Sequence, residues 1–174
     1  MCSESHRRNK RKLLNIYFLR LPSSGITFNG QILPWLPTVK YLGVVFDVRT
    51  TFKGHVDYAC ARALKFIRIL YPLICRRSLL SIPNKMLLYK SIFRAILAYG
   101  VPVWHDCAKT HRLRLQRVQN KCLKMIHNLP FFFSTAKLHE LAKIDSFENF
   151  CEKLSSKFSD KCQFSENPYI VQLG

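Results

Sequence analysis

Apolar side chains recur at helical spacing in five segments of the chain, most densely between residues 81 and 104. At about 100° per residue, the apolar positions of this segment fill an arc of about 200°, about twice the width typical of a surface helix. Ser81 is suited to cap the start, Pro83 falls in the first turn, and Gly100 with Pro102 provides a stop. We therefore expect one long, buried central helix onto which the other helices pack. The expected buried arc comprises Ile82, Met86, Leu88, Tyr89, Ile92, Phe93, Ala95, Ile96, Leu97 and Tyr99.

The same periodicity predicts four further helices, at about residues 52–71, 110–128, 135–142 and 147–162. Thr110 is a candidate N-cap for the second of these, and Ser146 begins a sequence like a capping box for the last. In the first, the apolar positions span an arc of about 120°. They are Phe52, Val56, Ala59, Cys60, Ala63, Phe66, Ile67 and Leu70. In the second they are Leu115, Val118, Cys122, Met125, Ile126 and Leu129.

Three β-rich runs precede the helices, at residues 13–19, 26–33 and 39–48. Asn29-Gly30 lies inside the second run and is a strong hairpin signal. Gly43 lies inside the third run, where a glycine marks either an ordinary bulge or a close approach by another backbone or a ligand. We interpret these runs as a small antiparallel sheet.

The predicted fold class is therefore mainly α, with a small N-terminal antiparallel β hairpin or sheet followed by a helical bundle. We divide the chain into a mobile basic tail at residues 1–12, a β segment at 13–50 and a helical region at 51–174. The basic tail is typical of a solvated or nuclear-targeting segment. With 174 residues and 48% hydrophobic content, the chain can bury one core of moderate size.

The charge of the chain points to a polyanionic partner. It carries 28 Lys and Arg against 10 Asp and Glu, a formal net charge of +18. Residues 1–139 hold 24 basic and 4 acidic side chains, whereas residues 140–174 hold 4 and 6. An excess of this size disfavours a compact fold through self-repulsion unless an anion offsets it. We therefore expect the partner to lie along the first four-fifths of the chain.

The cysteine usage indicates an intracellular protein, nuclear or cytoplasmic. Seven scattered cysteines, an odd number, are typical of reduced thiols that pack as small hydrophobes. We expect no membrane span, because Lys90 and Arg94 interrupt the longest apolar run, and no signal peptide. We also expect no metal site, because the spacing of the His and Cys residues between 105 and 127 matches no zinc template.

Two features of the third helical segment and its end leave alternatives open. Arg114, Arg117, Lys121 and Lys124 share an arc of about 80° beside the apolar stripe. Such a stripe is either a solvated face or a phosphate-binding face; without acidic partners at helical spacing, each neighbouring pair costs about 0.2–0.5 kcal/mol. The run Phe131 to Phe133 either stacks on bases or plugs the core, and the plug is favoured.

Several ordered motifs resemble one protein family. They are Asn29-Gly30, KYLGVVFD at 40–47, TF-x-x-H at 51–55, LYP at 70–72, Lys90-Ser91-Ile92, Tyr99-Gly100 with Trp104, LQRVQNKCLKMI at 115–126, Asn167-Pro168 and the closing QLG. In this order they resemble the region downstream of the catalytic palm in reverse transcriptases of non-LTR retrotransposons, in particular jockey-like elements. The resemblance covers about residues 9–174.

The resemblance implies a binding role. In that family the strand matching Lys40, Tyr41 and Gly43 belongs to the hairpin that grips the primer, at the end of the palm. The helices that follow form the thumb over the template–primer duplex of RNA and DNA. Residues 13–50 would then be the primer-grip segment and 51–174 a thumb-like helical bundle. The resemblance implies duplex contacts from the basic helix residues, namely Arg62, Lys65, Arg68, Arg114, Arg117, Lys121 and Lys124.

Catalysis is not expected from this chain alone. Two-metal nucleotidyl transfer needs paired carboxylates that hold metal ions about 3.5–4 Å apart. The chain has no Asp-Asp pair, and each acidic residue before position 140 stands alone. We therefore expect no catalytic residue and no cofactor here; the resemblance implies Mg²⁺ for the full-length enzyme, and the missing palm as a partner. The alternative hypothesis is a helical interaction module or a non-functional retroelement relic.

Overall fold

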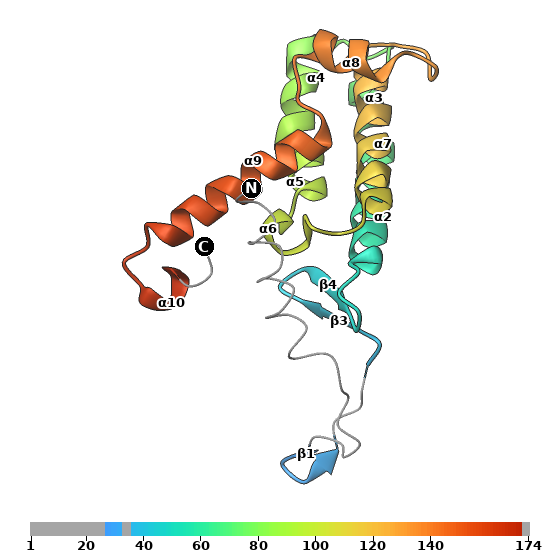
Figure 1. Ribbon diagram of the computed structural model, residues 1–174. Coiled ribbons are helices and arrows are strands. Elements are labelled where there is room, and N and C mark those ends of the chain that lie inside the picture. Colours follow the sequence, from blue (N-terminus) through green and yellow to red (C-terminus); the bar gives the residue numbers. More distant parts are fainter. Residues whose placement is uncertain (1–26, 33–35, 172–174) are drawn as a thin grey trace.

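The computed structural model describes residues 27–32 and 36–171. It confirms the mainly α class, with small antiparallel hairpins near the N-terminal end and helices from Lys53 onward (Figure 1). The predicted tail at 1–12 and the predicted strand at 13–19 lie outside the described residues.

The strands form two separate antiparallel hairpins. The first pairs β1 (Thr27–Phe28) with β2 (Gln31–Ile32), and the second pairs β3 (Thr38–Tyr41) with β4 (Val44–Asp47). Asn29 and Gly30 form the two-residue turn of the first hairpin with φ of 47° and 77°. Positive φ at both positions is the geometry that Asn-Gly favours, so the hairpin predicted there is confirmed.

The single strand predicted at 39–48 is wrong, because Leu42 and Gly43 make a tight turn inside it, with φ of 43° and 80°. The left-handed conformation is sterically unfavourable for leucine by roughly 1–2 kcal/mol. The Tyr99 hydroxyl compensates by donating a hydrogen bond of 2.9 Å to the Leu42 carbonyl. A Cβ on Gly43 would lie 2.8 Å from Cε1 of Tyr99, so the glycine is explained by the turn and by this ring.

The helices follow the predicted order with altered bounds. They are α2 (Lys53–Ile69), α3 (Tyr71–Ile74), α4 (Ile82–Leu88), the π-helix η1 (Tyr89–Phe93), α5 (Arg94–Leu97), α6 (Val101–Trp104), α7 (Lys109–Ile126), α8 (Thr135–Ala142), α9 (Phe147–Gln163) and α10 (Pro168–Val171). Four predicted helices are confirmed, as α2, α7, α8 and α9. Ser146 caps α9 by accepting the Asn149 N–H at 3.2 Å. Thr110 is not a cap, since α7 begins one residue earlier, after Ala108.

The predicted central helix at 81–104 is wrong in two respects. The predicted stop at Gly100 is confirmed, but the segment is not one helix to Trp104, because it ends at Leu97 and turns through Gly100 before α6 begins. Its buried apolar stripe is also narrower than the expected arc and comprises Met86, Tyr89, Phe93 and Leu97. The reason is incomplete coverage: Leu88, Ile92 and Ile96 are only partly buried, so the described neighbours cover only part of the expected arc. Ile82 and Tyr99 are about half exposed.

The helix that contacts most of the others is α7. It packs against α2, α4, η1, α8 and α9. It lies beside α2, and the two helices run in the same direction (Figure 1). Two core clusters form along this pair. One surrounds Trp104 beside the β3–β4 hairpin, and the other surrounds Phe93 and Ile126 toward α8. Val118 on α7 packs against both clusters.

Asp47 fixes the loop that leads into α2. Its carboxylate accepts hydrogen bonds of 2.7–3.1 Å from the N–H groups of Arg49, Thr51 and Phe52 and from the Thr51 hydroxyl. These bonds hold Thr50 and Phe52 at positive φ, 49° and 56°, which is costly for residues with a side chain. Partial burial acts to raise the pKa of the Asp47 carboxyl, but the hydrogen bonds outweigh it and the pKa is lowered overall.

We expect Asp47→Asn to lower the free energy of unfolding at pH 7 by about 2 kcal/mol, because an amide cannot accept all four bonds. The lowered pKa means that the carboxylate stabilises the fold above its unfolded pKa of about 3.9 and loses this effect as pH falls through the folded pKa. The difference between the two proteins in urea unfolding should therefore shrink below about pH 4. Asp160→Asn, at an exposed site on α9, serves as the control. A difference that stays constant with pH would contradict this role.

Candidate nucleic-acid interface

Exposed basic side chains lie along both α2 and α7, and we call this set the α2–α7 basic face. Arg62, Lys65 and Arg68 are exposed on α2, and Arg117 and Lys121 are exposed on α7. None of these five side chains forms an ion pair with a carboxylate among residues 27–32 and 36–171. The helices are adjacent, so the structure brings five of the predicted residues onto neighbouring elements.

An open groove of about 690 Å³ lies between α3 and α7, and we call it the α3–α7 groove. Its basic lining combines Arg117, Lys121 and Lys124 with Arg76. Arg76 was not predicted from the sequence, because it follows α3 in an irregular segment where no periodicity assigns a face. The other lining residues are Tyr71, Cys75, Asn120, Met125, Asn128, Leu129, Phe131 and Thr135.

Two members of the predicted basic stripe are engaged within the fold. Arg114 forms an ion pair with Asp57 of α2, so an acidic partner relieves its charge after all. The Lys124 ammonium donates a hydrogen bond to the Phe131 carbonyl and thereby ties the loop after α7 to the groove. Fewer cations of α7 are therefore free than the spacing alone indicated.

The predicted hairpin residues lie toward the other end of α2. The Lys40 ammonium lies 3.1 Å from the Tyr58 hydroxyl and 4.5 Å from the centre of the Tyr58 ring. This hydrogen bond and the positive charge lower the pKa of Tyr58. Tyr41 is 64% exposed at the end of β3. Arg68 lies ten positions after Tyr58, about 15 Å along the helix at 1.5 Å per residue, so Lys40 and Tyr41 extend the basic face without entering the groove.

The aromatic run after α7 divides into two parts. Phe133 is half-buried and packs against the core around Phe93, as a plug would. Phe131 and Phe132 are 87% and 77% exposed and contact each other edge to face, with ring centres 5.4 Å apart. The core-plug interpretation is therefore wrong for these two residues.

The glutamines of the LQRVQNKCLKMI motif have structural partners. Gln116 accepts the Phe147 N–H at 2.6 Å, and the buried Gln119 donates to the Asp145 carbonyl at 3.1 Å. Both bonds fix the segment that begins α9 against α7. This part of the motif is explained by folding and needs no ligand.

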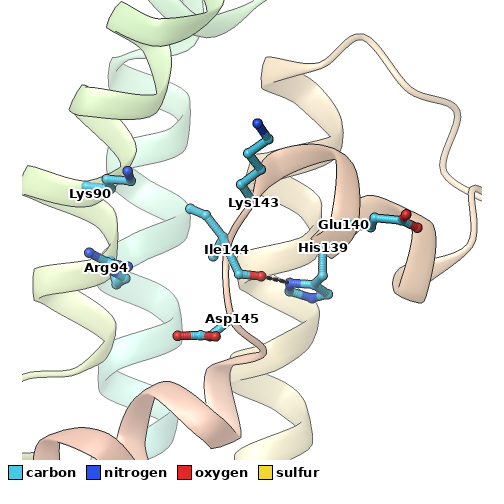
Figure 2. A pocket seen from close by; sticks show the side chains of 7 residues that line it. All are labelled: Lys90, Arg94, His139, Glu140, Lys143, Ile144 and Asp145. Atoms are coloured by element: carbon cyan, nitrogen blue, oxygen red, sulfur yellow. Dashed lines mark hydrogen bonds between the residues drawn. The ribbon is translucent and has the colours of Figure 1, made fainter.

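A second cavity, of about 370 Å³, lies between the η1–α5 helix and the segment that links α8 to α9 (Figure 2). Lys90 and Arg94 line one side and Lys143 the other, while Glu140 points away. The Asp145 carboxylate also lines this cavity, 2.7 Å from the Lys153 ammonium. Because the Asp145 carboxylate accompanies its cations, we place the candidate interface on the more uniformly basic α2–α7 face.

The described cysteines pack as small apolar groups. Burial raises the pKa of Cys122 and Cys151 to about 12, which keeps both thiols protonated. All six cysteines in the described part of the chain are free. None of the helices in the described part of the chain combines the length and the hydropathy of a transmembrane segment.

The described residues do not fit a magnesium pair. Across residues 27–32 and 36–171, no three His, Cys, Asp or Glu side chains come close enough together to hold a metal ion. The acidic residues before position 140 in the described part of the chain have other partners: Asp47 holds the entry to α2, Asp57 pairs with Arg114, and Asp106 lies 3.1 Å from His105.

Comparison with known proteins identifies relatives over most of the chain. It is 28% identical over 171 residues, 97% of its length, to the RNA-directed DNA polymerase from mobile element jockey of Drosophila melanogaster. It is 32% identical over 135 residues, 78% of its length, to a probable RNA-directed DNA polymerase from transposon X-element of the same organism. A third relative is a probable RNA-directed DNA polymerase from transposon BS of Drosophila melanogaster, to which the chain is 27% identical over 157 residues, 88% of its length.

The chain spans only 15–19% of the length of these relatives. No protein-family model matches the sequence, and no solved structure matches it significantly. The similarity to several related polymerases, over most of the chain, agrees with the order of motifs found in the sequence. The chain is therefore homologous, over most of its length, to a segment of the RNA-directed DNA polymerases of jockey and related non-LTR retrotransposons.

Proposed function

We propose that this chain is the thumb region of a non-LTR retrotransposon reverse transcriptase and that it holds the template–primer duplex through phosphate contacts. Two lines of support meet here. The relatives are named RNA-directed DNA polymerases, and such enzymes act on a nucleic-acid duplex. The helices carry a basic face of the kind that binds a phosphate backbone.

The observation that carries the proposal is the set of five exposed cations on α2 and α7 without carboxylate partners in the described structure. Like charges at helical spacing repel, and a chain with a net charge of +18 already disfavours compaction. Phosphates of a duplex laid along the two helices relieve this repulsion. Contacts of this kind read backbone shape and charge and carry little sequence preference.

The chain contributes binding and orientation in this proposal. The magnesium pair of the full-length enzyme finds no fitting set of carboxylates among the described residues, so the nucleotidyl transfer belongs to other parts of the polymerase. Lys40 and Tyr41 on the β3–β4 hairpin extend the basic face toward the primer.

The test is fluorescence anisotropy on a blunt RNA–DNA hybrid across a salt series. Six cations, Arg62, Lys65, Arg68, Arg76, Arg117 and Lys121, are available for phosphates. At about −0.9 per neutralised phosphate, the slope of log K against log salt should be near −5. Replacing both Arg117 and Lys121 by Gln should flatten the slope by about 2 and weaken binding to unrelated hybrids equally.

The matched control is Lys157→Gln with Lys161→Gln, which removes the same charge from exposed positions on α9. It should leave the slope unchanged. An equal effect of both double variants would mean that net charge, and not the α2–α7 face, drives binding. Absence of hybrid binding at low salt would instead favour a helical interaction module or a relic.

A further inference from the structure

We propose that Phe131 and Phe132 form a stacking platform for unpaired bases of a single-stranded extension of the duplex, beside the α3–α7 groove, whose cations hold the backbone where the duplex meets the extension. This inference rests on the proposed function and adds a specific ligand to it, namely single-stranded nucleic acid next to the duplex.

The exposure of the two rings is the first observation. Phe131 and Phe132 present most of their surface to solvent, although Leu129 and Phe133 on either side of them pack against the core. The loop is therefore anchored at both ends without help from these two side chains. Two adjacent exposed aromatic rings in contact with each other make an apolar surface that folding does not use.

The position of the rings beside cations is the second observation. Phe131 lines the same groove as Arg76, Arg117, Lys121 and Lys124. The Lys124 ammonium holds the Phe131 carbonyl, so the platform and the basic lining are fixed to each other. Sites for single strands combine these two elements, a positive groove for the backbone and aromatic rings for the bases.

Base pairing decides which nucleic acid the platform accepts. Bases inside a duplex are stacked on one another and expose no face, whereas an unpaired base offers its face to a ring. Because every base has such a face, the platform should tolerate all sequences. A blunt duplex would use the basic face alone.

The experiment compares three ligands for the full chain: a blunt RNA–DNA hybrid, the same hybrid with a single-stranded RNA extension, and the same extension made abasic. The abasic ligand carries the same phosphates without bases. We expect the intact extension to bind roughly tenfold more tightly than the abasic one, from stacking on the two rings. Replacing both Phe131 and Phe132 by Ala should abolish this difference and leave affinity for the blunt hybrid unchanged.

Phe164→Ala is the matched control, because Phe164 is 87% exposed at the end of α9, outside the groove. It should keep the full preference for the intact extension. Equal affinity of the parent for intact and abasic extensions, or a preference that survives the double Ala variant, would overturn the stacking platform alone. Failure of the parent to bind the blunt hybrid would overturn the proposed function as well.

Discussion

Phe93→Asp should abolish cooperative folding of the chain. Phe93 is 1% exposed and packs in the cluster that includes Tyr89, Leu123 and Ile126. A carboxylate at this position would be buried among apolar side chains without a partner, which costs several kcal/mol, a large share of the stability of a domain this size. Circular dichroism should show no sigmoidal thermal transition for this variant.

Ile92→Asp is the matched control, one residue earlier on the same helix. Ile92 is only partly buried, so its carboxylate can reach water and the variant should still melt cooperatively, at a reduced temperature. A reversed order of severity would mean that the π-helix does not turn Phe93 inward, and the description of the core around it would fail.

Trp104→Ala should lower the free energy of unfolding by about 3–5 kcal/mol, the range for deleting a large buried aromatic side chain. Trp104 is 1% exposed, its ring lies 5.5 Å from the His55 ring and 6.5 Å from the Phe147 ring, and its indole N–H donates to the Tyr99 carbonyl at 2.7 Å. It therefore joins α2, α6 and the start of α9. The measurement is the shift of the urea midpoint at constant m-value.

Trp104→Phe separates the volume of the ring from its hydrogen bond. Phenylalanine fills most of the space but leaves the Tyr99 carbonyl without its donor, so the loss should be smaller, about 1–3 kcal/mol. Equal losses for the Ala and Phe variants would show that the hydrogen bond, and not the packing, accounts for the effect.

Local sequence signals predicted the parts of the fold that depend on local physics. The apolar period located α2, α7, α8 and α9, and Asn29-Gly30 located the first hairpin, because each signal acts within a few residues. The Leu42-Gly43 turn escaped prediction because leucine disfavours positive φ; it is held by Tyr99, 57 positions later in the chain. The narrow stripe of the 82–97 helix escaped prediction because the apolar period shows which side chains can be buried, and not which of them another element covers.

For the candidate site, too, local signals predicted only part of the arrangement. Helical spacing showed which cations share a face of α2 or α7, but it could not show which of them the fold already uses. The Asp57 partner of Arg114 comes from another helix, and the Phe131 partner of Lys124 is a backbone carbonyl in a loop. Likewise, Arg76 joins the groove only through the packing of α3 near α7. Long-range contacts of this kind are not encoded in any single periodic segment.

Both core clusters include residues of the same two long helices, and this determines which parts of the molecule can unfold locally. Residues of α2 and α7 contribute to the cluster around Trp104 and to the cluster around Phe93. Neither cluster can come apart without fraying the same two helices, so their amide protons should exchange with solvent only through global unfolding. The last turns of α9, which bury Cys162 and little else, should exchange through local openings. Amide exchange would thus report two levels of protection, with the proposed duplex-binding face on the slowly exchanging level.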